Sequence, residues 1–239
     1  MDSTGVDPSR PASSRRQILT IFVLAGSALA SSARADVVCP DSSYVTVSFA
    51  CTFTGLYQPG EPYNYVTTCP LGDGESLAAA GITISVHLED CQGTPLAGVA
   101  AQDIVLTAPT LCPCGGGNIA DAPTDANGNT TFSGTLAVGG YAESLTIVAG
   151  GVTVGSVPVV INSFDSSPSC SIDTYDLEDW FNLNGKEVGD PGYDVRYDFN
   201  EDGFLDIKEY ALFNRHLAHR RNSCGPAVGA TSPAAGGTR

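Results

Sequence analysis

Oxygen-bearing side chains recur at alternate positions in the segment DFNEDGFLDIKE, which runs from Asp198 to Glu209. A glycine stands at the sixth position, where a loop that wraps an ion needs backbone freedom. A calcium ion takes about six to eight oxygen ligands from a loop of this kind. The sequence therefore predicts a calcium site, and its ligands are Asp198, Asn200, Asp202, the Phe204 carbonyl, Asp206 and Glu209.

The alternative interpretation of this segment is an acidic helix N-terminus without a metal. It explains Asp206, because a carboxylate is favoured near the positive end of a helix dipole. It does not explain the other oxygens and Gly203 in register, and carboxylates gathered without a cation repel one another. We therefore expect calcium. Magnesium fits less well, because it disfavours large and flexible cages.

A segment 33 positions earlier repeats the arrangement, because Ile172 and Asp173 align with Leu205 and Asp206. Serine replaces the ligands at the third and fifth positions, and Cys170 stands where the glycine belongs. Fewer charged ligands lower the affinity for calcium, so we expect weak binding or none in this degenerate first loop. The alternative is a linker that ends in a helix cap. The oxygen positions of the first loop are Asp165, Ser167, Ser169, Asp173 and Asp176.

The elements that must position these loops differ along the chain. Residues 175–183 and 207–217 carry apolar side chains at three- and four-residue steps, which predicts amphipathic helices. Across residues 37–161 the pattern has period two, as in 44–53 and 82–88, and turn-forming residues separate the runs. The sequence predicts a mainly β protein, an antiparallel sandwich, with a small C-terminal helical module.

Two motifs in the predicted sandwich resemble bacterial immunoglobulin-like domains of the invasin type. They are VHLEDCQGTPLAGV, at 86–99, and TDANGNTTF, at 124–132. The resemblance covers about residues 80–161. It implies an immunoglobulin-like sandwich, which we assign to residues 36–163, although the cysteines are not part of that family's pattern.

The two loop–helix units resemble the dockerin modules of bacterial exported proteins, which use EF-hand-type calcium loops. GDPGYDVRYDFNEDG, at 189–203, is similar to a second dockerin repeat with its connector. The resemblance covers about residues 164–221. It implies a calcium-folded module, assigned to 164–224, that binds a cohesin-like or other extracellular protein. Dockerins often carry small hydroxyl residues at loop positions ten and eleven, where this chain has Thr174-Tyr175 and Ile207-Lys208.

The cysteines predict disulfides, because an even number in an exported chain is typical of a disulfide framework. The sequence contains eight cysteines, all beyond residue 38. Cys170 and Cys224 bracket the helical module, and we expect them to pair.

The N-terminal segment resembles a secretory signal, which we assign to residues 1–35. An apolar run at 18–30 follows paired arginines, and residues 33–35 fit a cleavage site. The run is too short to span a bilayer, although an N-terminal membrane anchor remains the alternative. The flank SRRQIL resembles the twin-arginine export signal, but paired arginines also occur in ordinary export signals. We expect the periplasm, the cell surface or the medium as the location.

Charge excludes some partners. Residues 36–169 contain no Lys or Arg, and the formal net charge of the chain is −15. Such a surface cannot release counterions from a phosphate backbone, so we expect no nucleic-acid partner and no attachment to an anionic membrane. The tail at 225–239 is rich in Gly, Ala and Pro, and we expect it to be disordered.

Few other residues suggest chemistry. His216 and His219 lie three apart on the last helix, so both could contact one metal ion. The sequence places no third ligand beside them, and the preferred interpretation is cations at a helix C-terminus. No nucleophile elbow or local histidine suggests a hydrolase, so we expect no enzyme.

These patterns favour an exported, non-catalytic calcium-binding protein whose dockerin-like module docks, tethers or stabilises it. One alternative is a carbohydrate-binding or adhesive module at the cell surface, with Tyr57, Tyr63 and Tyr65 as a platform. Another is an accessory component of a polysaccharide-degrading assembly. A third is an enzyme whose site is assembled from scattered residues.

Overall fold

The computed structural model describes residues 37–50 and 64–219. All of these described residues belong to one compact unit. They are mainly β, with few helices, and none of those helices is long and apolar enough to cross a membrane. The predicted signal and tail, and Cys51, Tyr57, Tyr63 and Cys224, lie outside the described residues.

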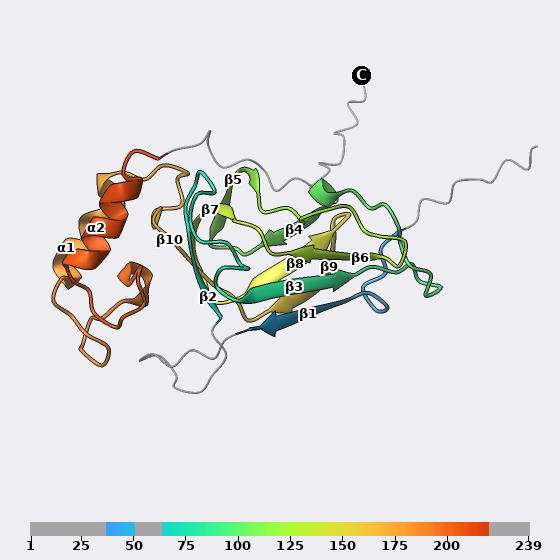
Figure 1. The fold of residues 1–239 in the computed structure, drawn as a ribbon, viewed down its shortest axis with the longest axis horizontal. Coiled ribbons are helices and arrows are strands. Elements are labelled where there is room, and N and C mark those ends of the chain that lie inside the picture. The colour runs from blue at the N-terminus through green and yellow to red at the C-terminus, as the bar shows by residue number, and fades with distance from the viewer. Residues whose placement is uncertain (1–36, 51–63, 220–239) are drawn as a thin grey trace, which may run out of the picture. The chain divides into compact units, whose positions relative to one another are not determined.

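The strands form three sheets (Figure 1). The first has the order β1-β3-β6, formed by β1 (Tyr44–Phe49), β3 (Ile82–His87) and β6 (Asn129–Phe132). The second has the order β2-β10-β7-β5, formed by β2 (Tyr65–Thr68), β10 (Val160–Ser163), β7 (Ala137–Ala142) and β5 (Leu111–Gly117). The third has the order β4-β8-β9, formed by β4 (Ile104–Thr107), β8 (Leu145–Ala149) and β9 (Val152–Val157). A short 3-10 helix, η1 (Ala101–Asp103), precedes β4.

One hydrophobic core is shared by the three sheets. Ile84 on β3, Ile161 on β10 and Ile147 on β8 are fully buried members of it. The period-two pattern explains how β3 contributes: Ile82, Ile84 and Val86 are buried, and the residues between them are not. Alternate side chains of a strand point to opposite faces, so the predicted strands that became β3 and β8 are confirmed as half-buried elements.

One expectation about the strands is corrected. β2 and β10 pair in parallel, with Val66 opposite Ile161, so the second sheet is mixed rather than antiparallel. The segment around Cys112 and Cys114 forms β5 and pairs with β7 across an irregularity. Its glycine run permits this, because a Cβ on Gly117 would collide with Ala137.

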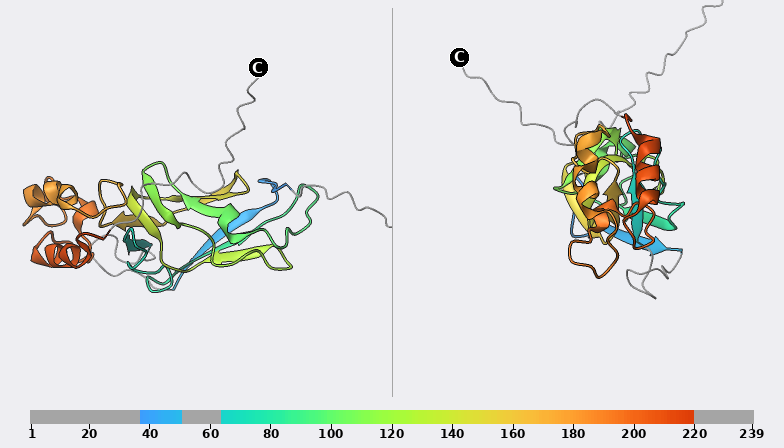
Figure 2. Two further views of the ribbon diagram at one scale, coloured as in Figure 1. Left: turned by 90° about the horizontal axis from the view of Figure 1, so that it is seen from above. Right: turned by 90° about the vertical axis from the view of Figure 1, so that its left-hand side faces the viewer.

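Both predicted helices are confirmed. The 3-10 helix η2 (Thr174–Leu177) continues into α1 (Glu178–Leu183), and α2 (Ile207–His216) follows the second loop. A further 3-10 helix, η3 (Val195–Tyr197), precedes that loop. α1 and α2 lie side by side (Figure 2). A second core lies between these elements, and its largest members include Trp180, Tyr197, Phe199 and Phe213.

The two loop–helix units repeat each other at the predicted offset. Cys170 and Gly203, 33 positions apart, both have positive φ, at 62° and 82°. Asp173 caps η2 and Asp206 caps α2, each within a capping box. The same backbone turn and the same helix cap therefore occur twice.

Reciprocal backbone hydrogen bonds join the two units. The N–H of Ile172 donates to the His219 carbonyl at 2.8 Å, and the Ile172 carbonyl accepts from the Ala218 N–H at 2.9 Å. The N–H of Leu205 donates to the Lys186 carbonyl at 2.9 Å, and the Leu205 carbonyl accepts from the Gly185 N–H at 2.7 Å. Each loop therefore pairs with the segment that follows the other unit's helix, and neither unit is complete alone.

Cys170 forms its disulfide with Cys114 on β5, so the predicted bond between Cys170 and Cys224 is wrong. The reason is that Cys170 is fully buried against β5, where Cys112, itself disulfide-bonded, also lies. A separate disulfide joins Cys39 to Cys91. The bond at Cys170 therefore ties the first loop to a sheet rather than closing the ends of the helical module.

Candidate metal centre

The second loop brings three of its predicted ligands together. Carboxylate oxygens of Asp198, Asp202 and Glu209 all lie within 4.8 Å of one another. Asp198 and Glu209 are completely buried. The turn is made at Gly203, whose positive φ suits glycine and whose N–H donates to Asp198 Oδ2 at 2.9 Å. The cluster is thus built by local backbone geometry.

Each buried carboxylate of this cluster has one satisfied oxygen and one orphaned oxygen. Asp198 Oδ2 also accepts from the Tyr193 hydroxyl at 2.6 Å, and Glu209 Oε2 accepts from the Asp206 N–H at 2.7 Å. Asp198 Oδ1 and Glu209 Oε1 are buried and have no hydrogen-bond partner among the described residues. Leaving a buried polar atom unpaired costs about 1–3 kcal/mol, and more for a charged group. These two oxygens are therefore positioned to coordinate a cation.

The pKa values of the buried carboxyls also indicate that a positive charge at this point would be stabilising. Burial raises the pKa of Asp198, and the charge of Asp202 adds to the rise, against hydrogen bonds that lower it. Burial also raises the pKa of Glu209 to about 7, with the charges of Asp198 and Asp206 adding to it. A divalent ion at this point would stabilise the charged forms of both groups.

The remaining predicted ligands hold the loop in shape. Asn200 Oδ1 accepts from the Asp202 N–H at 2.9 Å, and Asp202 Oδ1 accepts from the Phe204 N–H at 3.0 Å. Asp206 Oδ1 accepts from the Lys208 N–H at 2.7 Å, so it caps α2. The donor set contains only oxygen, which suits Ca²⁺ and not a softer ion.

Lys208 supplies a charge that the sequence analysis did not anticipate. Its ammonium donates to Asp202 Oδ2 at 2.5 Å and lies 3.6 Å from Asp206 Oδ2. The side chain is largely exposed, so this ion pair is worth little and can move aside. It neutralises the outer carboxylates but does not reach the orphaned oxygens of Asp198 and Glu209.

β2 supports the second loop from outside. The Tyr65 hydroxyl donates to the Asp198 carbonyl at 3.3 Å, and the Thr67 hydroxyl donates to the Phe199 carbonyl at 3.2 Å. The rings of Phe164 and Phe199 are 4.6 Å apart. Tyr65 and Thr67 thus hold the first two backbone carbonyls of the loop, although they lie more than a hundred positions away in the sequence.

Asp165 occupies in the first loop the place that Asp198 has in the second, but it is fully hydrogen-bonded. Its Oδ1 accepts from the N–H and the hydroxyl of Ser169, at 3.0 and 3.2 Å. Its Oδ2 accepts from the Cys170 N–H at 2.6 Å. The carboxylate packs so tightly on β7 that a Cβ on Gly139 would collide with it. Asp165 therefore packs against β7, and both of its carboxylate oxygens are hydrogen-bonded within the first loop.

Asp176 corresponds to Glu209, and both of its oxygens are also satisfied. Its Oδ1 accepts from the Ser167 N–H at 2.9 Å, and its Oδ2 accepts from the Asp173 N–H at 2.9 Å. Burial raises the pKa of Asp176, as it does that of Asp165. The first loop keeps the frame of a metal loop, but hydrogen bonds occupy the ligand oxygens.

A second group of metal-binding side chains was not predicted. Cys69 and Asp73 lie beside His216 and His219, with one ligand atom of each within 4.8 Å of the others. Burial raises the pKa of the Cys69 thiol to about 12, with a hydrogen bond to Asp73 adding to the rise, and burial lowers the pKa of His216. The paired histidines were a signal, but Cys69 is 150 positions from His219, so the sequence could not complete the set.

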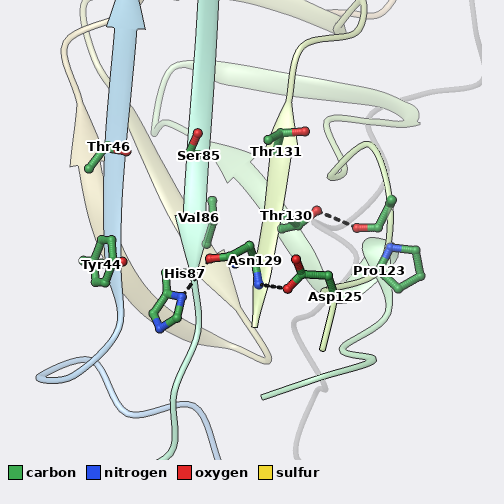
Figure 3. Close-up of a pocket in the computed structure, with 11 residues that line it drawn as sticks. Tyr44, Thr46, Ser85, Val86, His87, Pro123, Asp125, Asn129, Thr130 and Thr131 are labelled. Atoms are coloured by element: carbon green, nitrogen blue, oxygen red, sulfur yellow. Dashed lines mark hydrogen bonds between the residues drawn. The ribbon is translucent and has the colours of Figure 1, made fainter. Parts of the chain in front are cut away.

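The outer face of the first sheet carries a groove of about 520 Å³ (Figure 3). Tyr44, which is 54 % exposed, stacks on His87 with ring centroids 4.8 Å apart. His87 bonds to Asn129 at 2.8 Å and to Glu89 at 2.9 Å. Asp125 forms an Asx turn, in which its Oδ1 accepts from the N–H groups of residues 127 and 129, and it borders the groove.

Comparisons with known proteins add little. No protein family and no curated protein matches the sequence. Two similar solved structures are an N-terminal and a C-terminal interface mutant of a type II cohesin–X-dockerin complex from Acetivibrio cellulolyticus. The first is 16 % identical over 51 % of this chain and 87 % of that chain, with a TM-score of 0.24. The second is 15 % identical over 66 % and 95 %, with a TM-score of 0.26. Such values establish no shared fold.

Proposed function

We propose that this chain is an exported, non-catalytic calcium-binding protein. In this proposal residues 198–209 form an EF-hand-type calcium loop, residues 164–224 form a dockerin-like module, and the strands before it form an immunoglobulin-like sandwich. The module docks or tethers the protein to an extracellular partner, and calcium holds the module in its binding shape.

The observation that carries the proposal is the pair of orphaned oxygens in the second loop. Asp198 Oδ1 and Glu209 Oε1 are buried beside Asp202, and no donor among the described residues satisfies them. A bound Ca²⁺ removes both the unpaired polar atoms and the repulsion among the carboxylates. Because the ion binds this folded geometry, its binding free energy adds to the free energy of unfolding.

Docking requires exposed side chains, and positions ten and eleven of both loops provide them. Tyr175 is 76 % exposed and Ile207 is 70 % exposed. Their neighbours in these positions, Thr174 and Lys208, are exposed as well. An aromatic and an aliphatic side chain here would suit a partner surface with apolar pockets, and would not suit one that recognises small hydroxyl residues.

Calorimetric titration of the purified protein with calcium, together with circular dichroism in calcium and in chelator, tests the calcium step. We expect one calcium equivalent and a loss of helical signal on chelation. A protein that releases no heat at millimolar calcium, and whose helical signal ignores chelator, would overturn the proposal.

Surface plasmon resonance against a panel of cohesin domains tests docking separately. Binding in calcium that disappears in chelator, and that Ile207→Ser weakens, supports a dockerin-like role. Glu178→Gln serves as the matched control, because it is an exposed change on the other unit's helix. If calcium binds but the whole panel is silent, docking to cohesins is excluded and calcium-dependent stabilisation is retained.

The groove of Figure 3 favours a second candidate function, recognition of a carbohydrate by the first sheet. An exposed Tyr44 beside hydrogen-bonding groups of His87, Asp125 and Asn129 is the arrangement that stacking on a sugar ring requires. A glycan array with the wild type and with Tyr44→Ala tests it. Binding that Tyr44→Ala abolishes supports this function, and a silent array excludes it.

A further inference from the structure

A group of four metal-binding side chains lies outside both calcium-type loops. We propose that Cys69, Asp73, His216 and His219 bind one transition-metal ion, Zn²⁺. A thiol, two imidazoles and a carboxylate are the ligands that Zn²⁺ takes in tetrahedral sites, whereas Ca²⁺ takes oxygen only.

Two distances from His219 Nδ1 match the edges of a tetrahedron of zinc ligands. Zinc–sulfur and zinc–nitrogen bonds of about 2.3 and 2.0–2.1 Å place the two ligand atoms about 3.5 Å apart. Cys69 Sγ lies 3.6 Å from His219 Nδ1. The same bond lengths place a nitrogen about 3.3 Å from a carboxylate oxygen, and His219 Nδ1 lies 3.1 Å from Asp73 Oδ2. The side chains are thus already spaced as ligands.

The contacts within this group converge on few atoms. The thiol and the carboxylate both approach the same atom, His219 Nδ1, and the thiol is also hydrogen-bonded to Asp73, so three ligand groups meet at one point. A catalytic relay would place the carboxylate at the other ring nitrogen. The Cys69 side chain is also fully buried, unlike a working nucleophile. Convergence on one point is what a bound ion requires.

His216 provides an independent observation. Its Nδ1 atom is buried and has no hydrogen-bond partner among the described residues. The ring stacks on Phe164 with centroids 4.5 Å apart and meets the His219 ring edge-on at 5.2 Å. Packing therefore fixes the orientation of this imidazole, as metal sites require of their ligands.

The backbone on both sides of the group is also fixed, and one side is open. Cys69 follows β2 and accepts the Gly72 N–H at its carbonyl, at 2.8 Å. The His219 N–H donates to the His216 carbonyl at 2.9 Å, and its carbonyl accepts from Ile172. Asp73 and His216 line a cavity of about 320 Å³, which gives an ion a path to the group.

Binding would join segments that no disulfide among the described residues connects. The ion would link the turn after β2 to the residues that follow α2. It would also protect the Cys69 thiol, which is free in the structure, from oxidation. The site is independent of the calcium loop, so its failure leaves the proposed function unaffected.

Titration of the purified full chain with Co²⁺, followed by displacement with Zn²⁺, tests the site. We expect one equivalent of Co²⁺, with a thiolate charge-transfer band and visible bands of tetrahedral intensity that Zn²⁺ abolishes. Cys69→Ser should remove the charge-transfer band. His216→Ala and His219→Ala should each lower the affinity by about 100-fold or more, exceeding the loss of a second-shell partner.

The chain offers two matched controls. His87 is the third of its three histidines and lies on β3, so His87→Ala should leave cobalt binding unchanged. Glu209→Gln should remove calcium binding while leaving cobalt binding intact. A charge-transfer band that survives Cys69→Ser would overturn the proposal.

A measurement on the wild type covers the case in which a variant does not fold. Zinc should protect the Cys69 thiol from alkylation, as read by peptide mass spectrometry. X-ray absorption of the zinc-loaded protein should show one sulfur among four ligands. Peptide mapping that finds Cys69 in a disulfide, or a zinc spectrum without sulfur, excludes the site.

Discussion

The first loop, residues 165–176, and the second loop, residues 198–209, share one backbone and differ at the centre. In both, the carboxylate at position one accepts the N–H at position six, and the carboxylate at position twelve accepts the N–H at position nine. In the first loop, serine and backbone donors satisfy the other two oxygens. In the second loop those two oxygens are buried without a partner among the described residues.

The comparison shows two ways of stabilising the same turn. The first loop uses neutral hydrogen bonds, packing of Asp165 on Gly139 and a covalent bond from Cys170 to Cys114. The second loop leaves the negative charge of its buried carboxylates uncompensated, and a bound cation would neutralise that charge. Carboxylate oxygens that are already hydrogen-bonded are poor calcium ligands. Buried oxygens without a hydrogen-bond partner are stabilised when they bind the ion.

Removing the disulfide that holds the first loop should have the largest effect. Cys114→Ser with Cys170→Ser opens a link that spans 56 positions, and the chain-entropy model gives a loss of about 4 kcal/mol in the free energy of unfolding. Urea unfolding, followed by Trp180 fluorescence, measures it.

Cys39→Ser with Cys91→Ser is the control, because that bond spans a similar 52 positions. It should destabilise the chain without selectively changing the Trp180 signal, since Trp180 belongs to the second core. An equal change of that signal in both variants would contradict the role given to Cys170.

Neutralising position twelve should separate the two loops. Glu209→Gln places an amide beside the Asp198 carboxylate and removes a charged oxygen ligand, so calcium affinity should fall about 100-fold or more. Asp176→Asn, the equivalent change in the first loop, should alter calcium affinity less than about threefold while lowering stability, because it disturbs only hydrogen bonds. Calorimetry reports both. Equal losses of affinity would show that the first loop binds calcium too.

Acidity should affect the metal-free protein in the direction set by Glu209. Burial raises its pKa from 4.5 to about 7, so the folded state favours the protonated form. In chelator, the contribution of this group to stability is full below about pH 4.5 and is lost as pH rises through 7. Denaturation between pH 4 and 8 should show this decline in chelator and not in calcium. A metal-free protein that gains stability over the same range would contradict it.

Lys208 should give the smallest effect. Its exposed ammonium competes with calcium for Asp202, so Lys208→Gln should raise calcium affinity by no more than a few-fold. Lys186→Gln is a control, because that lysine lies outside the loop. Weaker calcium binding in Lys208→Gln would show that the lysine supports the loop rather than competing with the ion.

Local elements followed directly from the sequence. The apolar periods placed the strands at 82–87 and 145–149 and the helix at 207–216 close to their observed bounds. The 33-residue offset was also visible, and the structure repeats it in turns, caps and backbone pairing. The apolar periods, turns and caps depend on residues within a dozen positions of one another, where backbone geometry decides.

Expectations that depend on distant residues were weaker. The partner of Cys170 was wrongly predicted because cysteine spacing does not determine which strand a loop packs against. The parallel pairing of β2 with β10 was missed because alternation reveals a buried face but not a neighbour. Hydrogen bonds from Ser167 and Ser169 also could not be read from residue type alone.

The sequence by itself therefore determined the repeated loop, the oxygen-bearing side chains of its second copy and the alternation that builds the sheets. Only the tertiary structure decided that Cys170 bonds to Cys114, and that Cys69 and Asp73 meet His216 and His219. The physical reason is range. Ligand spacing within twelve residues is set by φ and ψ, whereas burial and long-range encounters are set by how sheets and helices pack.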